Sequence, residues 1–238
     1  PDSSVRSDAL ECFARITSDL TGDTIETERM FEEVVDVRTR MLGSDHPSTL
    51  AAQHTLAQSY MGRGNIVEAL ALQKTVVEAY RRVLGNEEES TLTALETLAD
   101  MQRRSGDRRT AIASLNEVLV ISEAKFGPDA EVTLDTLQAL STACGDAGEM
   151  DEAMRLAMDL IDRRKRVQGA WHQDTLRSIT MLGILYYKQE RYSDAIALVE
   201  EELSLRRSHD QSNTYAIIIA THNLGLYRLL NEDAAAAE

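Results

Sequence analysis

Apolar residues along the chain recur at the spacing of an α-helix, without the alternation of a β-strand. They fall at Leu50, Leu56 and Tyr60, and a second stretch with the same spacing begins at residue 66 and runs to about residue 84. This spacing predicts two amphipathic helices. The stretch between them, 61–65, contains Gly64, which can adopt the left-handed backbone conformation that ends a helix. The pattern therefore predicts a helical hairpin.

The hairpin recurs along the chain with a period of 42 residues. Segments that begin at positions 42, 84, 126 and 168 read LGSDHPSTL, LGNEEESTL, FGPDAEVTL and QGAWHQDTL. A leucine column keeps the same interval at positions 56, 98, 140, 182 and 224, and an alanine column keeps it at 69, 111, 153, 195 and 237. A fixed period of this kind is the signature of a repeat array, in which each unit buries its apolar face against its neighbours.

Small residues in the register indicate how the helices pack. Positions 57, 99, 141, 183 and 225 hold only alanine, serine or glycine. Helices approach closely where side chains are short, and leucines fill the remaining space. The expected units are 1–42 (diverged), 43–84, 85–126, 127–168, 169–210 and 211–238 (incomplete). In the last unit the register places a turn near Glu232, so 231–238 is expected to begin a second helix of a longer parent protein.

The segment LGSDHPSTL, read alone, could be a catalytic loop, because it combines an aspartate with a histidine. The register instead predicts a connection between hairpins, in which Pro47 suits the first helical turn and one of Ser44, Asp45 and Ser48 caps it. Histidine recurs in the column of His46 only at position 172. We therefore expect no metal ligand in this column, and no metal or cofactor elsewhere.

Composition limits the function further. The 238 residues carry a net charge of −15, which argues against a nucleic-acid binder and favours basic or apolar partners. The longest apolar run, near 215–220, is too short to cross a membrane. The chain has only two cysteines, Cys12 and Cys144, and neither has partner ligands at metal spacing, which is typical of a cytoplasmic protein.

The repeat resembles a known family. Leu-Ala-x-x-Tyr at 56–60, followed by Gly64 and Ala69, is similar to the tetratricopeptide repeat, and the Leu-Gly-x-x-His-Pro connection resembles the longer kinesin light chain type. The resemblance implies an all-α fold, a right-handed superhelical solenoid of antiparallel helix pairs. It also implies a concave groove lined by the first helix of each pair, in which a peptide segment binds. Kinesin light chains carry an Asn-Asn pair before the leucine of the first helix, and only Asn223 matches it here. Their cargo preference is therefore not transferred.

Carried over by register, the resemblance places a row of residues in the groove. The row is polar in its middle and becomes apolar toward the C-terminal end, where Ile184, Ile219 and Leu229 join it. A following segment of the parent protein, a bound partner with an apolar anchor, or a second copy of the chain could cover the apolar end. The groove residues expected to bind a partner are His54, Gln58, Glu96, Asp100, Arg103, Arg104, Asp135, Gln138, Asp146, Arg177, Thr180, Tyr187, Lys188, His222 and Leu226.

Three functions remain open at this stage. The first is a scaffold that binds a peptide or a partner domain in the groove. The second is a sensor or regulatory array that packs on other domains of a larger signalling protein of the immune-like kind. The third is an enzyme with a pocket formed by His222, Tyr187, Lys188, Asp146 and Arg177. The chain lacks a nucleophile elbow, a zinc-protease motif and a phosphate-binding loop, so we favour the scaffold and expect no catalytic residue.

Overall fold

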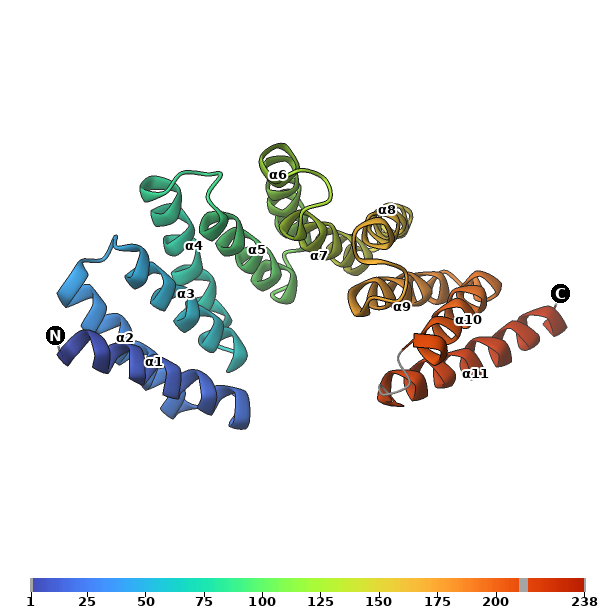
Figure 1. Cartoon of the computed structure of the whole chain (residues 1–238), viewed down its shortest axis with the longest axis horizontal. Coiled ribbons are helices and arrows are strands. Elements are labelled where there is room, and N and C mark those ends of the chain that lie inside the picture. Colours follow the sequence, from blue (N-terminus) through green and yellow to red (C-terminus); the bar gives the residue numbers. More distant parts are fainter. Residues whose placement is uncertain (1, 210–213, 238) are drawn as a thin grey trace. The chain divides into compact units, whose positions relative to one another are not determined.

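The computed structural model describes residues 2–209 and 214–237, and these residues form eleven α-helices and no strand (Figure 1). The all-α fold expected from the apolar spacing is confirmed. The helices are α1 (Asp2–Thr21), α2 (Ile25–Leu42), α3 (Pro47–Gly62), α4 (Ile66–Val83), α5 (Glu89–Arg104), α6 (Arg108–Phe126), α7 (Glu131–Ala147), α8 (Met150–Gln168), α9 (Gln173–Lys188), α10 (Tyr192–His209) and α11 (Thr214–Ala237).

The chain divides into two compact units, Pro1–Val118 and Leu119–Glu238, and α6 spans the boundary. Helices α1 to α5 pack in succession in the first unit, and helices α7 to α11 pack in the same way in the second. The connections that the structure describes are two to five residues long, so consecutive helices run antiparallel. The expected boundary between 169–210 and 211–238 falls at residues 210–213, which lie outside the described part of the chain.

Burial follows the columns of the repeat. The leucines at 56, 98, 140 and 182 are buried, and the alanines at 69, 111, 153 and 195 are fully enclosed. Ser141, in the column of small residues, donates from its Oγ to the carbonyl oxygen of Ala153 at 2.8 Å, which joins α7 to α8. The side chain of Ala237 lies outside the described residues. The predicted pairing of small residues with large ones is therefore confirmed in four copies, whereas on α11 Leu224 is half-buried and Gly225 is exposed.

Two glycine columns end the helices in different ways. Gly64, Gly106 and Gly148 have φ angles of 84°, 94° and 85°, as the turn prediction requires. Glu190 occupies the same column and also takes a positive φ, 58°. In the other column, Gly85 also has a positive φ, 95°. Gly43 and Gly169 of that column have ψ angles of 161° and 159°, an extended region that only glycine adopts without strain.

The connections between hairpins are held by residues other than those expected. Nδ1 of His46 accepts from the backbone N–H of Ser48 at 3.1 Å, so the histidine caps α3 in place of a serine or aspartate. His172 caps α9 in the same way, at 3.3 Å. A threonine column ties three of these connections to the next helix, because its hydroxyls donate to the glycine carbonyl oxygens: Thr91 to Gly85, Thr133 to Gly127 and Thr175 to Gly169.

The last helix departs from the register. We expected a turn near Glu232, but α11 continues without a break through 231–237. Glu190 shows that glutamate alone does not prevent the turn. After Glu190, however, Ala195, Val199 and Leu203 bury an apolar face, whereas the residues after Glu232 are mainly alanines. Without large side chains to pack back, the high helix propensity of alanine continues the helix.

Candidate functional site

The first helices of two consecutive hairpins in the second unit, α7 and α9, form a pocket of about 350 Å³. We call it the α7–α9 pocket. Four of the groove residues expected to bind a partner line it, namely Asp146, Arg177, Thr180 and Lys188. The other lining residues are Ser141, Thr142, Gly145, Met181, Ile184 and Leu185.

This pocket has an apolar floor and a polar rim. Met181, Ile184 and Leu185 form the floor, and Ile184 remains 40% exposed. A Cβ added at Gly145 would lie 3.1 Å from Cδ2 of Leu185, so the glycine permits the close approach of α7 and α9. Arg177 stands on the rim with its side chain 73% exposed. An apolar floor with a few polar groups around it is typical of sites that hold a side chain or a small ligand.

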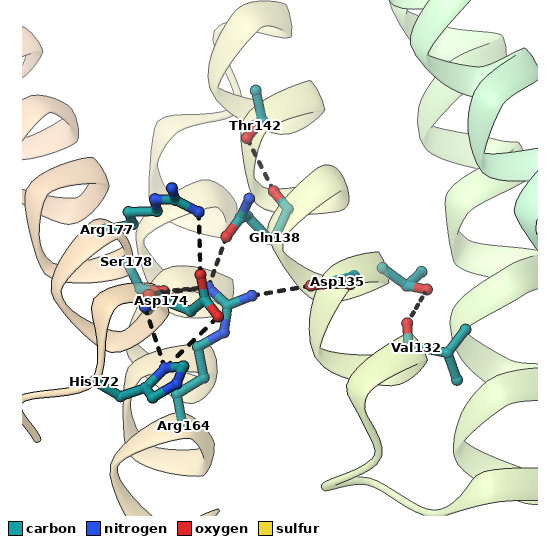
Figure 2. A network of polar contacts seen from close by, with 10 residues as sticks. Val132, Asp135, Gln138, Thr142, Arg164, His172, Asp174, Arg177 and Ser178 are labelled. Carbon is teal, nitrogen blue, oxygen red and sulfur yellow. Dashed lines mark hydrogen bonds and ion pairs between the residues drawn. The ribbon is translucent and has the colours of Figure 1, made fainter. Parts of the chain in front are cut away.

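A buried arginine joins the three helices beside this pocket (Figure 2). The Arg164 side chain, from α8, is only 4% exposed. Its Nη1 donates to Oε1 of Gln138 at 2.6 Å on α7. It also donates to the hydroxyl of Ser178 at 2.8 Å and to the carbonyl oxygen of Asp174 at 3.1 Å, both on α9. Its Nη2 lies 3.1 Å from Oδ1 of Asp135. Asp135 and Gln138 were expected to face a ligand, and here they hold Arg164.

Burial governs the electrostatics of this pair. Desolvation lowers the pKa of Arg164, while the charges of Asp135 and Asp174 oppose that change. Desolvation also raises the pKa of Asp135, and the guanidinium of Arg164 partly offsets it. Because an arginine pKa starts so high, the guanidinium keeps its charge at neutral pH, and the contacts remain charge-assisted hydrogen bonds.

The sequence argument missed Arg164 because it followed only apolar and small columns. Its own column, positions 38, 80, 122, 164 and 206, holds Arg38, Tyr80, Ser122, Arg164 and Arg206. We call this the clamp position. Arg38 bonds Asp8 and Glu11 at 2.8 and 2.6 Å, and the buried Arg206 bonds Glu202 at 2.8 Å. The available signal for Arg164 was that polar residues recur in this column, at a position where the helix should be buried.

The first unit links its helices differently, through a glutamine on α4. Nε2 of Gln73 donates to the carbonyl oxygen of Ala94 on α5 at 2.8 Å and lies 3.0 Å from Nδ1 of His54 on α3. Gln73 is fully buried. Desolvation lowers the pKa of His54, with a smaller opposing effect from its hydrogen bond to Gln73. His54 was expected in the groove, and it belongs in part to this internal bridge.

The lowered pKa of His54 predicts a pH dependence of stability. Below the ordinary value of 6.5 the unfolded chain binds a proton that the folded chain resists, so the stability contribution is full above 6.5 and falls as the pH falls. We expect the free energy of unfolding, measured with urea, to decrease between about pH 7.5 and 5.5. His54→Gln should reduce that decrease, because glutamine can bond Gln73 without titrating. An equal decrease in this variant and in the control His222→Gln, an exposed residue of α11, would contradict the assignment.

A second pocket, of about 480 Å³, lies in the first unit, and we call it the α3–α5 pocket. It contains two of the expected groove residues, His54 and Gln58. It differs from the α7–α9 pocket because its lining is mainly polar. The remaining lining residues are Glu11, Arg15, Ala51, Thr55, Tyr80, Glu88, Glu89, Ser90 and Thr93.

The other expected groove residues of the first unit lie on α5. Asp100 is exposed, and its carboxylate bonds Arg103 at 2.7 Å. Arg104 lies 4.0 Å from the same carboxylate. Glu96 is half-buried on the same helix. These residues form a charged surface in which Asp100 pairs with both arginines along the helix, and none of them lines the α3–α5 pocket.

At the expected apolar end of the groove, some residues pack inside the second unit and others lie on its surface. Tyr187 stacks on Tyr227, with ring centroids 5.2 Å apart, and packs against the core of the second unit. His222 and Leu226 instead lie on an exposed face of α11. Large apolar side chains accompany them on α11: Tyr215, Ile218, Ile219 and Leu229.

The residues named for a catalytic pocket are only partly brought together. Asp146, Arg177 and Lys188 share the α7–α9 pocket, and Tyr187 and His222 are absent from its lining. In the described part of the chain, no group of three or more histidine, cysteine, aspartate or glutamate residues could hold a metal ion. Among the same residues, every helix is too short or too polar to serve as a membrane span.

Comparison with known proteins gives consistent matches to one kind of repeat. Models of the tetratricopeptide repeat match residues 48–124, and residues 16–48 and 175–209. A putative kinesin light chain from Podospora anserina, with nearly identical TPR-like repeats, has a solved structure that is 26% identical, with a TM-score of 0.76 over 89% of this chain and 99% of that one. No curated protein matches the sequence.

Two more distant structures share the fold. BtubC from P. vanneervenii is 16% identical, with a TM-score of 0.74 over 87% of this chain and 83% of its own. A signal transduction ATPase with numerous domains from Pyrococcus horikoshii, which has a tetratricopeptide repeat sensor, is 13% identical. Its TM-score is 0.74, over 97% of this chain and 34% of that chain.

Proposed function

Since the chain belongs to the tetratricopeptide repeat family, with repeats of the kinesin light chain type, we propose that it is a protein-interaction scaffold that binds a partner segment in the α7–α9 pocket. The observation that carries the proposal is the pocket's construction. Two first helices enclose an apolar floor, and charged side chains of both signs surround it. An apolar anchor of the partner would occupy the floor, and the rim would select the residues beside the anchor.

The Arg164 network supports this role because it keeps the pocket walls in place. Arg164 bonds both α7 and α9, the two helices that form the pocket. A preformed pocket binds more tightly than one that must be ordered, since less conformational entropy is lost on association. The proposed scaffold therefore depends on a polar contact that itself lies beside the binding surface.

Binding to labelled peptides tests the proposal. In fluorescence polarisation against a peptide library, we expect the bound sequences to share one large apolar residue. Ile184→Asp places a charge on the pocket floor and should weaken these peptides by about tenfold or more, since a charge without a partner in a desolvated site costs over 1.4 kcal/mol. The control Val67→Asp adds the same charge at a residue of α4 that is 77% exposed, and it should bind normally.

Equal binding by both variants would remove the α7–α9 pocket from the proposal. If no peptide binds and a small molecule is turned over, the scaffold proposal fails and the enzyme alternative replaces it.

The same pocket could also receive a segment of the parent protein, as in a sensor array of a larger signalling protein. The Pyrococcus protein, whose repeats are named a sensor, is the observation that keeps this second candidate. Self-association through the exposed face of α11 would appear as a concentration-dependent mass in sedimentation.

A further inference from the structure

The clamp position holds different residue types in different repeats, and one of these substitutions leaves space. In the second unit Arg164 occupies it, and the atoms that receive its guanidinium come from residues 135, 138, 174 and 178. Two repeats before Arg164, the clamp position holds Tyr80. The four receiving positions then hold Ala51, His54, Ser90 and Ala94.

The α3–α5 pocket lies at this substituted clamp. Its lining includes Tyr80 together with three of the four corresponding receiving residues, Ala51, His54 and Ser90. The fourth, Ala94, accepts the hydrogen bond from Gln73 instead. Replacing an arginine and its aspartate partner by a tyrosine and an alanine removes the internal guanidinium, and a pocket of about 480 Å³ is present there.

Tyr80 shows that the pocket retains an unused polar group. The residue is only 5% exposed, yet its hydroxyl makes no hydrogen bond within the described residues. The hydroxyl oxygen is also not among the fully buried polar atoms that lack a hydrogen bond. The hydroxyl therefore meets the open space of the pocket. A hydroxyl that faces the pocket without a protein partner can bond a ligand group that replaces water there.

The charges around the pocket favour a cation. Glu11, Glu88 and Glu89 line it, against the single cation Arg15. Glu11 is already bonded by Arg38 at 2.6 Å, so part of its charge is neutralised. Glu89 is exposed, and its side chain has no hydrogen bond or ion pair in the described part of the chain. Its carboxylate is the group most available to a positively charged ligand.

We propose that the α3–α5 pocket receives the guanidinium of an arginine from a basic peptide segment. The incoming arginine would take the place that Arg164 holds internally in the second unit. Glu89 would accept a charge-assisted hydrogen bond, and the Tyr80 hydroxyl would accept a second one. Arginine suits the pocket better than lysine, because its planar fork of donors bonds several acceptors at once and stacks on an aromatic ring. This inference rests on the proposed function as a peptide-binding scaffold, but it names a different site and a different recognition chemistry.

Matched peptides test the recognised group. Short fluorescein-labelled peptides with a central arginine are compared by fluorescence polarisation with identical peptides that carry citrulline or lysine. Citrulline keeps the shape and removes the charge, so we expect it to bind about tenfold more weakly or worse, since hydrogen bonds to charged groups contribute more than 1.4 kcal/mol. Lysine should fall between the two. Equal affinity for arginine and citrulline would overturn the proposal.

Variants of the protein test the location. Glu89→Gln should weaken the arginine peptide by about tenfold. Glu78→Gln removes the same charge from an exposed residue of α4 outside the pocket, so it controls for net charge. The double variant Ala51→Asp with Tyr80→Arg restores the arginine–aspartate pair of the clamp and fills the pocket with an internal guanidinium, so it should abolish arginine binding, with its fold checked by circular dichroism. Unchanged binding in this variant, or equal loss in Glu89→Gln and Glu78→Gln, would overturn the proposal.

These results are separable from a failure of the proposed function. Ile184→Asp lies in the second unit and should not change the affinity for the arginine peptide. If apolar-anchor peptides fail to bind while arginine peptides bind and respond to Glu89→Gln, the α7–α9 proposal fails and this inference stands. If apolar-anchor peptides bind while arginine peptides fail to bind, this inference fails and the α7–α9 proposal stands.

Discussion

Leu140→Ala is expected to lower the free energy of unfolding of the second unit by about 2–5 kcal/mol. Leu140 is only 2% exposed on α7 and belongs to the leucine column of the repeat. The substitution removes buried carbon atoms and leaves a cavity, because a closely packed helix pair collapses only partly around it. Urea denaturation followed by circular dichroism measures the change.

An exposed leucine provides the control. Leu229→Ala removes the same atoms from α11, where the side chain is 57% exposed, so the loss should be less than about 1 kcal/mol. If both variants unfold at the wild-type urea concentration, the leucine column does not form the core and the register is wrong. If both are equally destabilised, α11 is more deeply packed than its exposure indicates.

Arg164→Ala is expected to lower the free energy of unfolding by about 3 kcal/mol. It removes the donor for Gln138 and Ser178 and a contact that spans α7, α8 and α9 (Figure 2). We place the loss at the lower end of the range for broken buried pairs, because the side chain of Asp135 is 58% exposed and water can solvate it. The same variant should weaken apolar-anchor peptides, since the walls of the α7–α9 pocket lose their tether.

Two further variants identify the cause of the stability loss expected for Arg164→Ala. Arg166→Ala removes an arginine of the same helix whose 2.6 Å ion pair with Asp129 lies at the surface, and its melting temperature should equal that of the wild type. Arg164→Met keeps the apolar stem and removes only the guanidinium. Wild-type stability in Arg164→Met would show that the stem, and not the polar network, holds the helices together.

The clamp position has different uses in different repeats, and where it holds Ser122 the hydroxyl donates to the carbonyl oxygen of Leu119 at 3.1 Å. Where it holds Arg38, Arg164 or Arg206, a guanidinium is bonded internally. Where it holds Tyr80, the bridge moves to Gln73 and the clamp site opens as a pocket. Substitutions at the clamp position and at the positions that receive its side chain thus convert a structural contact into a candidate binding site. The helices are unaltered, because the repeat backbone is set by the leucine, alanine and glycine columns.

The sequence by itself determined the helices, their hairpin pairing and their buried faces. The period of 42 residues predicted which leucines and alanines are enclosed, and Gly64, Gly106 and Gly148 marked the turns within hairpins. These features follow from local rules, since the spacing of apolar residues sets the helix face and a positive φ requires a permissive residue. They were predictable because each depends on residues close together in the chain.

The tertiary structure alone decided which polar residues of the first helices remain available to a partner. Asp135, Gln138 and His54 looked like surface residues by register, and they bond Arg164 and Gln73 across neighbouring helices. Such pairs depend on the distance between side chains from separate helices, which the periodicity of a sequence does not contain. The uninterrupted α11 was likewise decided by tertiary contacts, because a turn forms only where the residues after it can bury an apolar face.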